Sequence, residues 1–204
     1  MDAMNPVLRR IHLGALRLFA ERGVNQISVS DLAQAAGVAR GTIYNNLSSP
    51  ETLFDDVSSQ LVSEMHQRVV KSFDEVSDPA QRLAFGMRFF IRRAHEEPDW
   101  GRFFVRFAFN DASLREILAG PAVYDLQTGL DQGRYCFRHE QLMTVAAMIA
   151  GAVLGAMLLV QEGHKTWRDA GADATELVLK ALGIAPDEAY ALSIADLPPL
   201  LSLE

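Results

Sequence analysis

Polar side chains gather on one face of a short predicted helix at residues 40–47. Ile43 and Leu47 lie four residues apart and define the inner face of that helix. Guanidinium and hydroxyl groups on the outer face can donate to phosphate oxygens, and a carboxamide can pair with an adenine edge in a bidentate way. This chemistry indicates recognition of a polyanion rather than catalysis. The outer residues are Arg40, Thr42, Tyr44, Asn45 and Asn46.

A second short helix must position that face. Ser28 can cap it, and Asp31, three residues later, can complete a capping box. Gly37 follows where a left-handed, helix-ending residue is needed, and Val38 can fold back onto the helix. Two short helices joined by a glycine-containing turn match the helix-turn-helix, whose second helix lies in the DNA major groove. The apolar stripe of the first helix is Val29, Leu32, Ala33 and Ala36.

Local runs of sequence carry a family resemblance: LFAERG at 18–23, AAGV at 35–38, GTIY at 41–44, and the pair Glu51 and Leu53. Through these runs, residues 15–54 resemble the amino-terminal domain of the TetR family of transcriptional regulators. The resemblance covers roughly the first third of the chain. It implies a DNA-binding head and a helical body that holds a small-molecule cavity and forms a dimer.

The resemblance also implies which residues touch DNA. The matching threonine and tyrosine in TetR-like domains, here Thr42 and Tyr44, typically contact the DNA backbone. Taken without that resemblance, Tyr44 could instead be a packing residue, and Asn45 and Asn46 could be plain polar surface. The predicted DNA contacts are Ser28, Ser30, Arg40, Gly41, Thr42, Tyr44, Asn45 and Asn46.

The sequence departs from the family pattern at four positions. Ala39 replaces the serine or threonine common before the second helix, which removes a cap worth roughly 1 kcal/mol. Asn45 stands at a histidine-like position, and Leu47 stands where an aromatic residue often closes the motif. Pro50 stands where the family often has a lysine at the start of the fourth helix, and it offers no charge to a phosphate. We expect an intact fold with one fewer electrostatic contact.

The composition is that of an ordinary globular chain. Of 204 residues, 49% are hydrophobic and 22% charged, which allows one large or two small domains. The net charge is -7, but residues 1–50 hold five arginines against three acidic residues, a net +2, so the remainder carries -9. This asymmetry favours a basic head that contacts phosphates. The single Cys136 and a polar amino terminus favour a cytoplasmic protein. We expect no cofactor and no metal.

Helical periodicity predicts an all-α fold that begins with a three-helix helix-turn-helix domain. We expect the DNA-binding domain at residues 1–48, with the start of a connecting helix to about residue 65, and a helical effector-binding and dimerisation domain at 49–204. The predicted helices cover residues 6–22, 28–36, 40–47, 50 to about 73, 79 to about 97, 100–109, 111–120, a stretch from Pro121, 142–160, 175–182, and a short helix from Pro186.

Aromatic side chains repeat at helical spacing near the middle of the chain. Trp100, Phe103, Phe104 and Phe107 fall at i, i+3, i+4 and i+7, which is a complete helical face. One interpretation is a solid core. The other, implied by the resemblance, is the wall of a small-molecule cavity, because large rings with a few polar tips suit such a pocket. The predicted effector contacts are Phe90, Trp100, Phe103, Phe104, Phe107, Tyr124, Gln127 and Met148.

Residues 142–160 contain no charge, so a transmembrane helix must be considered. The segment is rich in alanine and glycine, and neither flank has a convincing excess of positive charge, so we predict a buried helix and no membrane partner. With residues 175–182 it can pair with a second subunit in a four-helix interface, as TetR-like proteins usually do. The predicted dimer contacts are Ala147, Gly151, Ala152, Gly155, Leu158, Leu177 and Ala181.

These patterns predict a DNA-binding regulator, namely a homodimeric repressor released from a near-palindromic operator by a small, largely apolar ligand. A two-fold dimer places its recognition helices about 34 Å apart, or a multiple of that. The alternatives are a ligand-independent regulator or an activator, and a membrane-associated adaptor that uses residues 142–160. We expect no enzyme, because the sequence has no nucleophile elbow, phosphate-binding glycine loop or paired metal-ligand motif.

Overall fold

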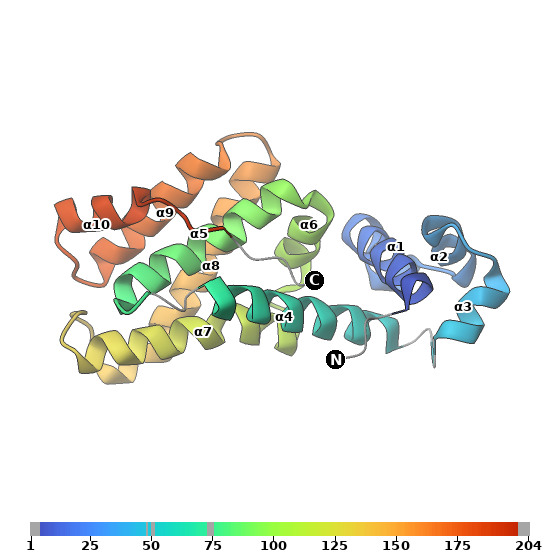
Figure 1. Ribbon diagram of the computed structural model, residues 1–204, viewed down its shortest axis with the longest axis horizontal. Coiled ribbons are helices and arrows are strands. Elements are labelled where there is room, and N and C mark those ends of the chain that lie inside the picture. Colours follow the sequence, from blue (N-terminus) through green and yellow to red (C-terminus); the bar gives the residue numbers. More distant parts are fainter. Residues whose placement is uncertain (1–4, 48, 50–51, 73–75, 200–204) are drawn as a thin grey trace. The chain divides into compact units, whose positions relative to one another are not determined.

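The computed structural model describes residues 5–47, 49, 52–72 and 76–199, and within these ranges it contains helices and no strand (Figure 1). The predicted all-α fold is confirmed. The chain divides into two compact units, Met1–Ser63 and Glu64–Glu204. The helices are α1 (Pro6–Arg22), α2 (Val29–Ala36), α3 (Arg40–Asn46), α4 (Leu53–Ser72), α5 (Pro79–Glu96), α6 (Pro98–Phe107), α7 (Ala112–Asp131), α8 (Leu142–Gln161), α9 (Trp167–Ala181) and α10 (Pro186–Ile194), with short 3-10 turns η1 (Val24–Gln26) and η3 (His139–Gln141).

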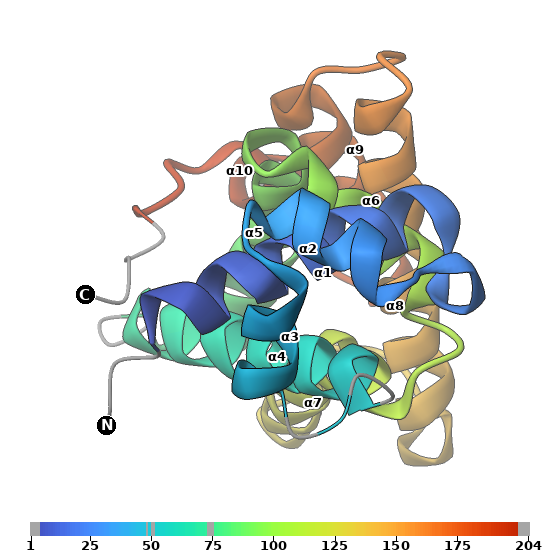
Figure 2. The ribbon, with the colours of Figure 1, turned by 90° about the vertical axis from the view of Figure 1, so that its right-hand side faces the viewer.

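In the amino-terminal unit α1 packs against α2 and α3, and Figure 2 shows these three helices together. The side chain of Asn5 caps α1 by accepting the Val7 N–H at 2.9 Å, and Gly23 ends the helix with a φ of 81°. Gly14 lies where α1 meets α2, because a Cβ there would stand 3.0 Å from the backbone nitrogen of Ala36. A larger side chain would therefore force the two helices apart.

Local interactions fix both ends of α2 as predicted. The backbone N–H of Asp31 donates to Ser28 Oγ at 3.2 Å, and the Asp31 carboxylate accepts the Ser28 N–H at 3.0 Å, which completes the capping box. Gly37 adopts the left-handed conformation, with φ 62°, and the Val38 N–H donates to the carbonyl of Ala33 at 3.0 Å. The turn into α3 is therefore set by hydrogen bonds within a dozen residues.

Helix α3 is short and held from one side. Ile43 is fully buried and Leu47 nearly so, which confirms the predicted inner face. Ala39 precedes the helix in an extended conformation and makes no side-chain cap. The predicted start of the next helix at Pro50 lies outside the described residues, and α4 is described from Leu53. An apolar stripe with a four-residue spacing is buried along the whole helix: Leu53, Val57, Leu61, Met65 and Val69.

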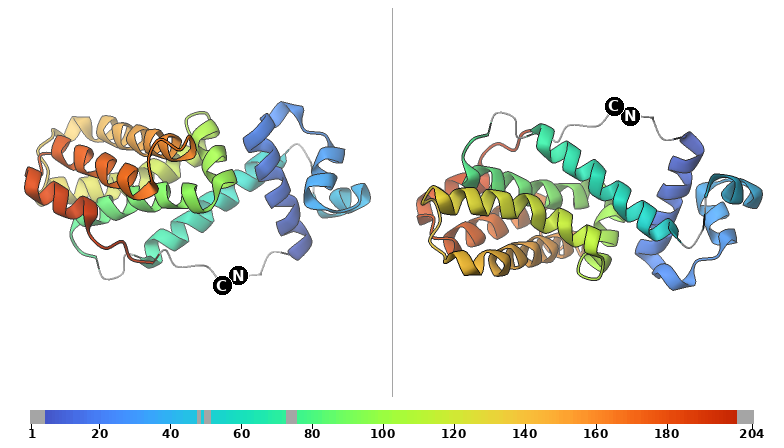
Figure 3. Two further views of the ribbon diagram at one scale, coloured as in Figure 1. Left: turned by 90° about the horizontal axis from the view of Figure 1, so that it is seen from above. Right: turned by 90° about the horizontal axis from the view of Figure 1, so that it is seen from below.

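Helix α5 is the centre of the carboxy-terminal unit. It packs against α6, α7, α8, α9 and α10 (Figures 1 and 3). Asp78 caps it by accepting the Ala80 N–H at 3.2 Å, and Pro79 occupies its first turn, where no intrahelical N–H bond is lost. Its apolar side chains at helical spacing are buried, among them Leu83, Met87, Phe90, Ile91 and Ala94.

Two predicted helix boundaries are wrong. The backbone stays helical through Pro121, so α7 is one helix rather than two. A proline removes one helical hydrogen bond, and the buried Leu114 and Leu126 on either side anchor the helix regardless. Helix α9 begins at Trp167 rather than near Thr175, because Thr166 caps it by accepting the Asp169 N–H at 3.1 Å.

Helix α8 explains the long uncharged segment. Within the described ranges, His139–Gln161 is the one stretch long and apolar enough to cross a bilayer by length and composition, and 44% of its most apolar window is buried inside the unit. Helix α8 packs against α5, α6, α7 and α9, and a core helix has this same composition. The uncovered part of α8 faces a groove described below.

The missing cap of α3 gives a stability prediction. Ala39→Ser should raise the free energy of unfolding by about 1 kcal/mol, because Ala39 already has the extended backbone of a cap residue. Ser28→Ala should lower it by a similar amount by breaking the box on α2. Urea denaturation followed by circular dichroism, at one protein concentration, measures both. A serine at 39 that leaves stability unchanged would contradict the assigned helix start.

Candidate DNA-binding interface and effector site

The outer face of α3, opposite the buried Ile43, is accessible to solvent. Tyr44 is 62% exposed, and Arg40, Gly41 and Asn45 are exposed as well. Thr42 and Asn46 are half-buried, as are Ser30 and Asp31 on α2, while Ser28 is exposed. All the predicted DNA contacts therefore retain some accessible surface.

Internal hydrogen bonds already engage part of this face. The Asn46 carboxamide donates to the Thr42 carbonyl at 2.9 Å, and Arg40 donates to the Ser30 hydroxyl. Tyr44 and Asn45 have no hydrogen-bond partner among the residues that the structure describes. A hydroxyl and a carboxamide that point outward without internal partners are suited to an external one.

Gly41 is not explained by the fold of its own unit. A Cβ at this position would meet nothing within 4 Å, and the residue does not have a positive φ. Glycine inside a helix is destabilising by roughly 0.5–1 kcal/mol relative to alanine. Neither packing nor backbone conformation therefore requires a glycine here. The absence of a side chain at Gly41 leaves room for the backbone of another molecule to approach α3 closely.

Arginines brace the turn in a way that sequence reasoning missed. Arg10 donates to the carbonyl of Gly37 at 2.6 Å, so it caps the end of α2 rather than simply facing solvent. Arg22 lies 3.2 Å from Asp31. The Ser28 hydroxyl, the Ser28 N–H and Arg22 together hold the pKa of the Asp31 carboxyl below its usual value. An arginine 27 residues before a helix-ending glycine is a weak sequence signal, because α1 must first pack on α2 before the two can meet.

The predicted aromatic face forms a packed cluster in the carboxy-terminal unit. The ring centroids of Trp100 and Phe104 lie 4.3 Å apart, and Phe90 lies 5.8 Å from Trp100 and 6.0 Å from Phe104. Phe103 pairs with Phe107 at 5.1 Å. These are the separations of favourable aromatic pairs. All but Phe107 are buried, so in this structure the rings touch one another.

The other predicted effector contacts lie elsewhere on the unit. Tyr124 is 65% exposed on α7, and Gln127 donates to Asp131 at 2.9 Å along the same helix. Met148 is 43% exposed and lines a groove between α8 and α9.

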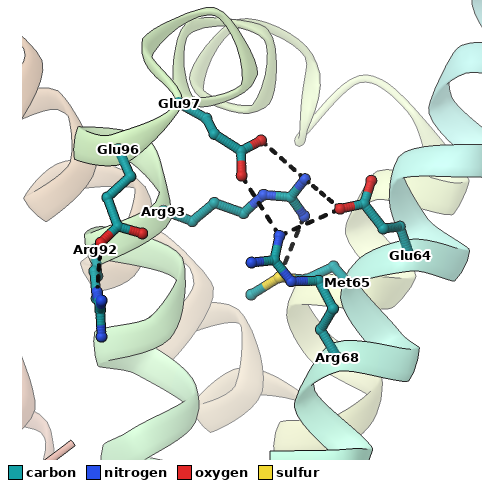
Figure 4. A network of polar contacts seen from close by, with 7 residues as sticks. All are labelled: Glu64, Met65, Arg68, Arg92, Arg93, Glu96 and Glu97. Carbon is teal, nitrogen blue, oxygen red and sulfur yellow. Dashed lines mark hydrogen bonds and ion pairs between the residues drawn. The ribbon is translucent and has the colours of Figure 1, made fainter. Parts of the chain in front are cut away.

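A buried arginine of α5 forms an ion pair with a carboxylate of α4 (Figure 4). Arg93 is 2% exposed and donates to Glu64 at 2.8 Å and to Glu97 at 3.0 Å. Arg68 lies 3.3 Å and 3.4 Å from the same two carboxylates. The Arg93 guanidinium also stands 4.5 Å from the centroid of the Trp100 ring. Displacement of that ring would therefore disturb the group that fastens the second half of α4.

The groove between α8 and α9 has a volume of about 460 Å³ and gathers most of the predicted dimer contacts. Leu177 is 67% exposed on its edge. Added Cβ atoms at Gly151 and Gly155 would meet nothing within 4 Å, so packing within the unit does not require these glycines either. Ala147 and Leu158 are exposed on the same helix. The predicted contacts that line the groove are Ala152, Gly155, Leu177 and Ala181.

Models of known protein families match parts of both units of the chain. The family described as bacterial regulatory proteins, tetR family, matches residues 11–57, and the tetracyclin repressor-like C-terminal domain matches residues 78–195. The chain belongs to the TetR family. The expected kinship, inferred from residues 15–54, is thereby confirmed and extends to the body.

Curated relatives of this TetR-family protein include repressors, and solved structures of similar fold include two determined with a bound small molecule. The repressor KstR2 of Mycobacterium tuberculosis H37Rv is 30% identical over 69 residues, which is 34% of each chain, so the match spans about a third of the length of that relative. The crystal structure of RolR in complex with resorcinol has a TM-score of 0.71 at 24% identity and covers 96% of each chain. FadR from Bacillus subtilis in complex with stearoyl-CoA has a TM-score of 0.70 at 20% identity, over 86% of this chain and 97% of its own. The two solved structures share the fold.

Gly41 gives a prediction that separates folding from binding in this TetR-family protein. Gly41→Ala should leave the free energy of unfolding unchanged or raise it by up to about 1 kcal/mol, because the position is helical and open. The same variant should bind DNA more weakly, because the added methyl group blocks close approach. Thermal melting and fluorescence anisotropy with operator DNA measure the two effects. Unchanged DNA affinity would remove Gly41 from the interface.

Proposed function

We propose that this protein is a homodimeric repressor that leaves a near-palindromic operator when a small, largely apolar ligand binds its body. The observation that carries the proposal is the outer face of α3, with Tyr44 and Asn45 unengaged and Gly41 open to close approach. An exposed recognition helix on a packed helix-turn-helix suits the DNA major groove. Backbone contacts would come from Arg40, Thr42 and Tyr44, and base contacts from Asn45, with Asn46 as a second candidate.

Dimerisation through α8 and α9 is supported by the groove between them. Small residues there let a second helix approach, and the exposed apolar side chains of Leu158, Leu159 and Leu177 would be covered by it. The two copies would form a two-fold interface that uses the same surface twice. Such symmetry matches a palindromic operator.

The interface predicts a monomerising substitution. Gly155→Asp should convert the dimer to a monomer at micromolar concentration, because an unpaired carboxylate would be buried between the two copies. Ala191→Asp adds the same charge at an exposed position of α10 and should leave the dimer intact. Sedimentation velocity distinguishes the two results. A dimeric Gly155→Asp variant would place the interface elsewhere.

The aromatic cluster and Arg93 support the ligand half of the proposal. A ligand that enters between the rings must separate Trp100 from Phe104, and Arg93 lies against that same indole. Arg93 holds Glu64 of α4, and α4 continues without a break to Leu53 in the amino-terminal unit. Ligand and DNA need only prefer different states of this one helix. RolR and FadR, solved with resorcinol and stearoyl-CoA, make an aromatic or acyl ligand reasonable.

A ligand-independent regulator is the second candidate, because the rings of the cluster are buried against one another in this structure. The two functions differ in one observable, which is whether any small molecule lowers operator affinity. Activation rather than repression differs only in where the operator lies relative to the promoter.

Selection of genomic fragments tests the proposal directly. The purified protein should retain fragments that share a near-palindrome, at stated salt, because phosphate contacts make affinity salt-dependent. Tyr44→Ala should weaken binding to such a site about tenfold or more while helicity and dimer mass stay unchanged, since the side chain is 62% exposed. Tyr190→Ala, at an exposed tyrosine of α10, is the matched control and should bind normally. Retention without any shared site would contradict sequence-specific recognition.

A further inference from the structure

A second cavity in the carboxy-terminal unit is lined by three arginines. It has a volume of about 500 Å³ and lies between α5, the start of α9 and the segment that follows α10. The cations come from two helices, and apolar and acidic side chains complete the wall. Its side-chain lining includes Arg88, Arg92, Trp167, Arg168, Asp169 and Asp196.

Arg88 is the deepest of these cations. The residue is buried, with 9% of its surface exposed. Its guanidinium donates to the carbonyl of Ala195 at 2.6 Å. No carboxylate among the described residues forms an ion pair with it. Burial lowers the pKa of Arg88, and the charge of Asp196 opposes that shift. A buried cation without an ion-pair partner is costly, and an anion beside it would reduce that cost.

The other two arginines lie beside one indole. The Arg168 guanidinium stands 4.4 Å from the ring centroid of Trp167, and that of Arg92 stands 5.5 Å away. Arg92 also donates to Glu96 at 2.7 Å, whereas Arg168 has no carboxylate partner in the described part of the chain. Arg168 therefore keeps its N–H groups as donors beside the indole, whereas Arg92 shares its Nε–H with Glu96.

Two aspartates stand against the three arginines in the lining of the cavity. Asp169 belongs to the cap of α9, where its carboxylate accepts the Thr166 hydroxyl at 2.7 Å. Asp196 faces Arg88 without an ion-pair contact. The first-turn N–H groups of α9 add partial positive charge at the same end of the helix. The cavity is thus locally cationic in a body of net negative charge.

We propose that this cavity binds a small organic oxyanion, a carboxylate or a phosphate monoester, with Arg88 and Arg168 as its donors. Guanidinium groups bind both kinds of oxyanion in a bidentate way. The volume matches that of small-molecule sites and exceeds what a bare ion needs. Ile194 and Leu197 offer apolar surface to the remainder of the ligand. The site does not involve the aromatic cluster, so it goes beyond the proposed effector site.

The two tryptophans make the site directly observable. The chain has only Trp100 and Trp167, so 5-fluorotryptophan labelling gives two ¹⁹F resonances, which Trp167→Phe assigns. Titration of the full-length protein with benzoate or phenyl phosphate should shift the Trp167 resonance saturably and leave Trp100 unmoved. The probe that binds more tightly identifies the carboxylate or the phosphate. Benzyl alcohol, which lacks the charge, should not shift it.

Substitution of one donor completes the test. Arg168→Ala should weaken binding of the better probe about tenfold or more, since a charge-assisted hydrogen bond is lost. Arg138→Ala removes another exposed arginine, outside the cavity lining, and should bind as the unmodified protein does. The proposal is overturned if neither probe moves Trp167, if only Trp100 responds, or if Arg168→Ala binds with unchanged affinity. None of these outcomes bears on operator binding, which is measured without either probe.

Discussion

The buried guanidinium of Arg93, held between Glu64 and Glu97, is the interaction on which the link between α4 and the body depends. Removing both carboxylates would leave the Arg93 charge buried without an ion-pair partner, which is costly. The arginine also stacks on Trp100, so the ionic network and the aromatic cluster form one continuous structure. Any rearrangement of the rings must either carry Arg93 with them or break its contacts.

Five glycines inside helices of this protein differ in what surrounds them. At Gly14 and Gly101 an added Cβ would collide with a neighbouring helix, so the fold itself demands the missing side chain. At Gly41, Gly151 and Gly155 an added Cβ would meet nothing within 4 Å. Each of these glycines lowers helix stability, and no close packing within its own unit requires it. These three glycines lie on the outer face of α3 and on the exposed side of α8. Our proposal places DNA on the first of these surfaces and a second subunit on the other. The lower helix stability that these glycines cause in the single chain is consistent with contacts that form only in the dimer bound to DNA.

Local signals explain which parts of the fold were predictable. The ends of α2 follow from Ser28 and Gly37, because capping and left-handed turns are decided within a few residues. The continuity of α7 through Pro121 was not predictable, since burial on both sides of the proline keeps the helix intact and burial is a property of the whole unit. The start of α9 at Trp167 was not predictable, because the first half of the helix is polar and alanine-rich and its packing depends on the folded unit. For the candidate sites the same division holds. The outer face of α3 can be read from spacing alone, whereas the contact of Arg93 with Glu64 joins residues 29 positions apart.

The distribution of ion pairs ties the charge asymmetry of the sequence to both proposed sites. In the described part of the body, many cations are matched to carboxylates: Arg82 lies 2.7 Å from Asp125, and Arg134 lies 2.6 Å from Glu188. Cations that are neutralised in this way attract a phosphate backbone weakly, and the excess negative charge of the body repels it. The duplex is therefore drawn to the helix-turn-helix end of the chain, where residues 1–50 carry a net charge of +2. Arg88 and Arg168 depart from this arrangement, because they lack such partners and line one concave surface. The cavity is large enough for a small anion but too narrow for a DNA duplex. A cationic cavity can therefore bind such an anion although the net negative charge of the body repels DNA.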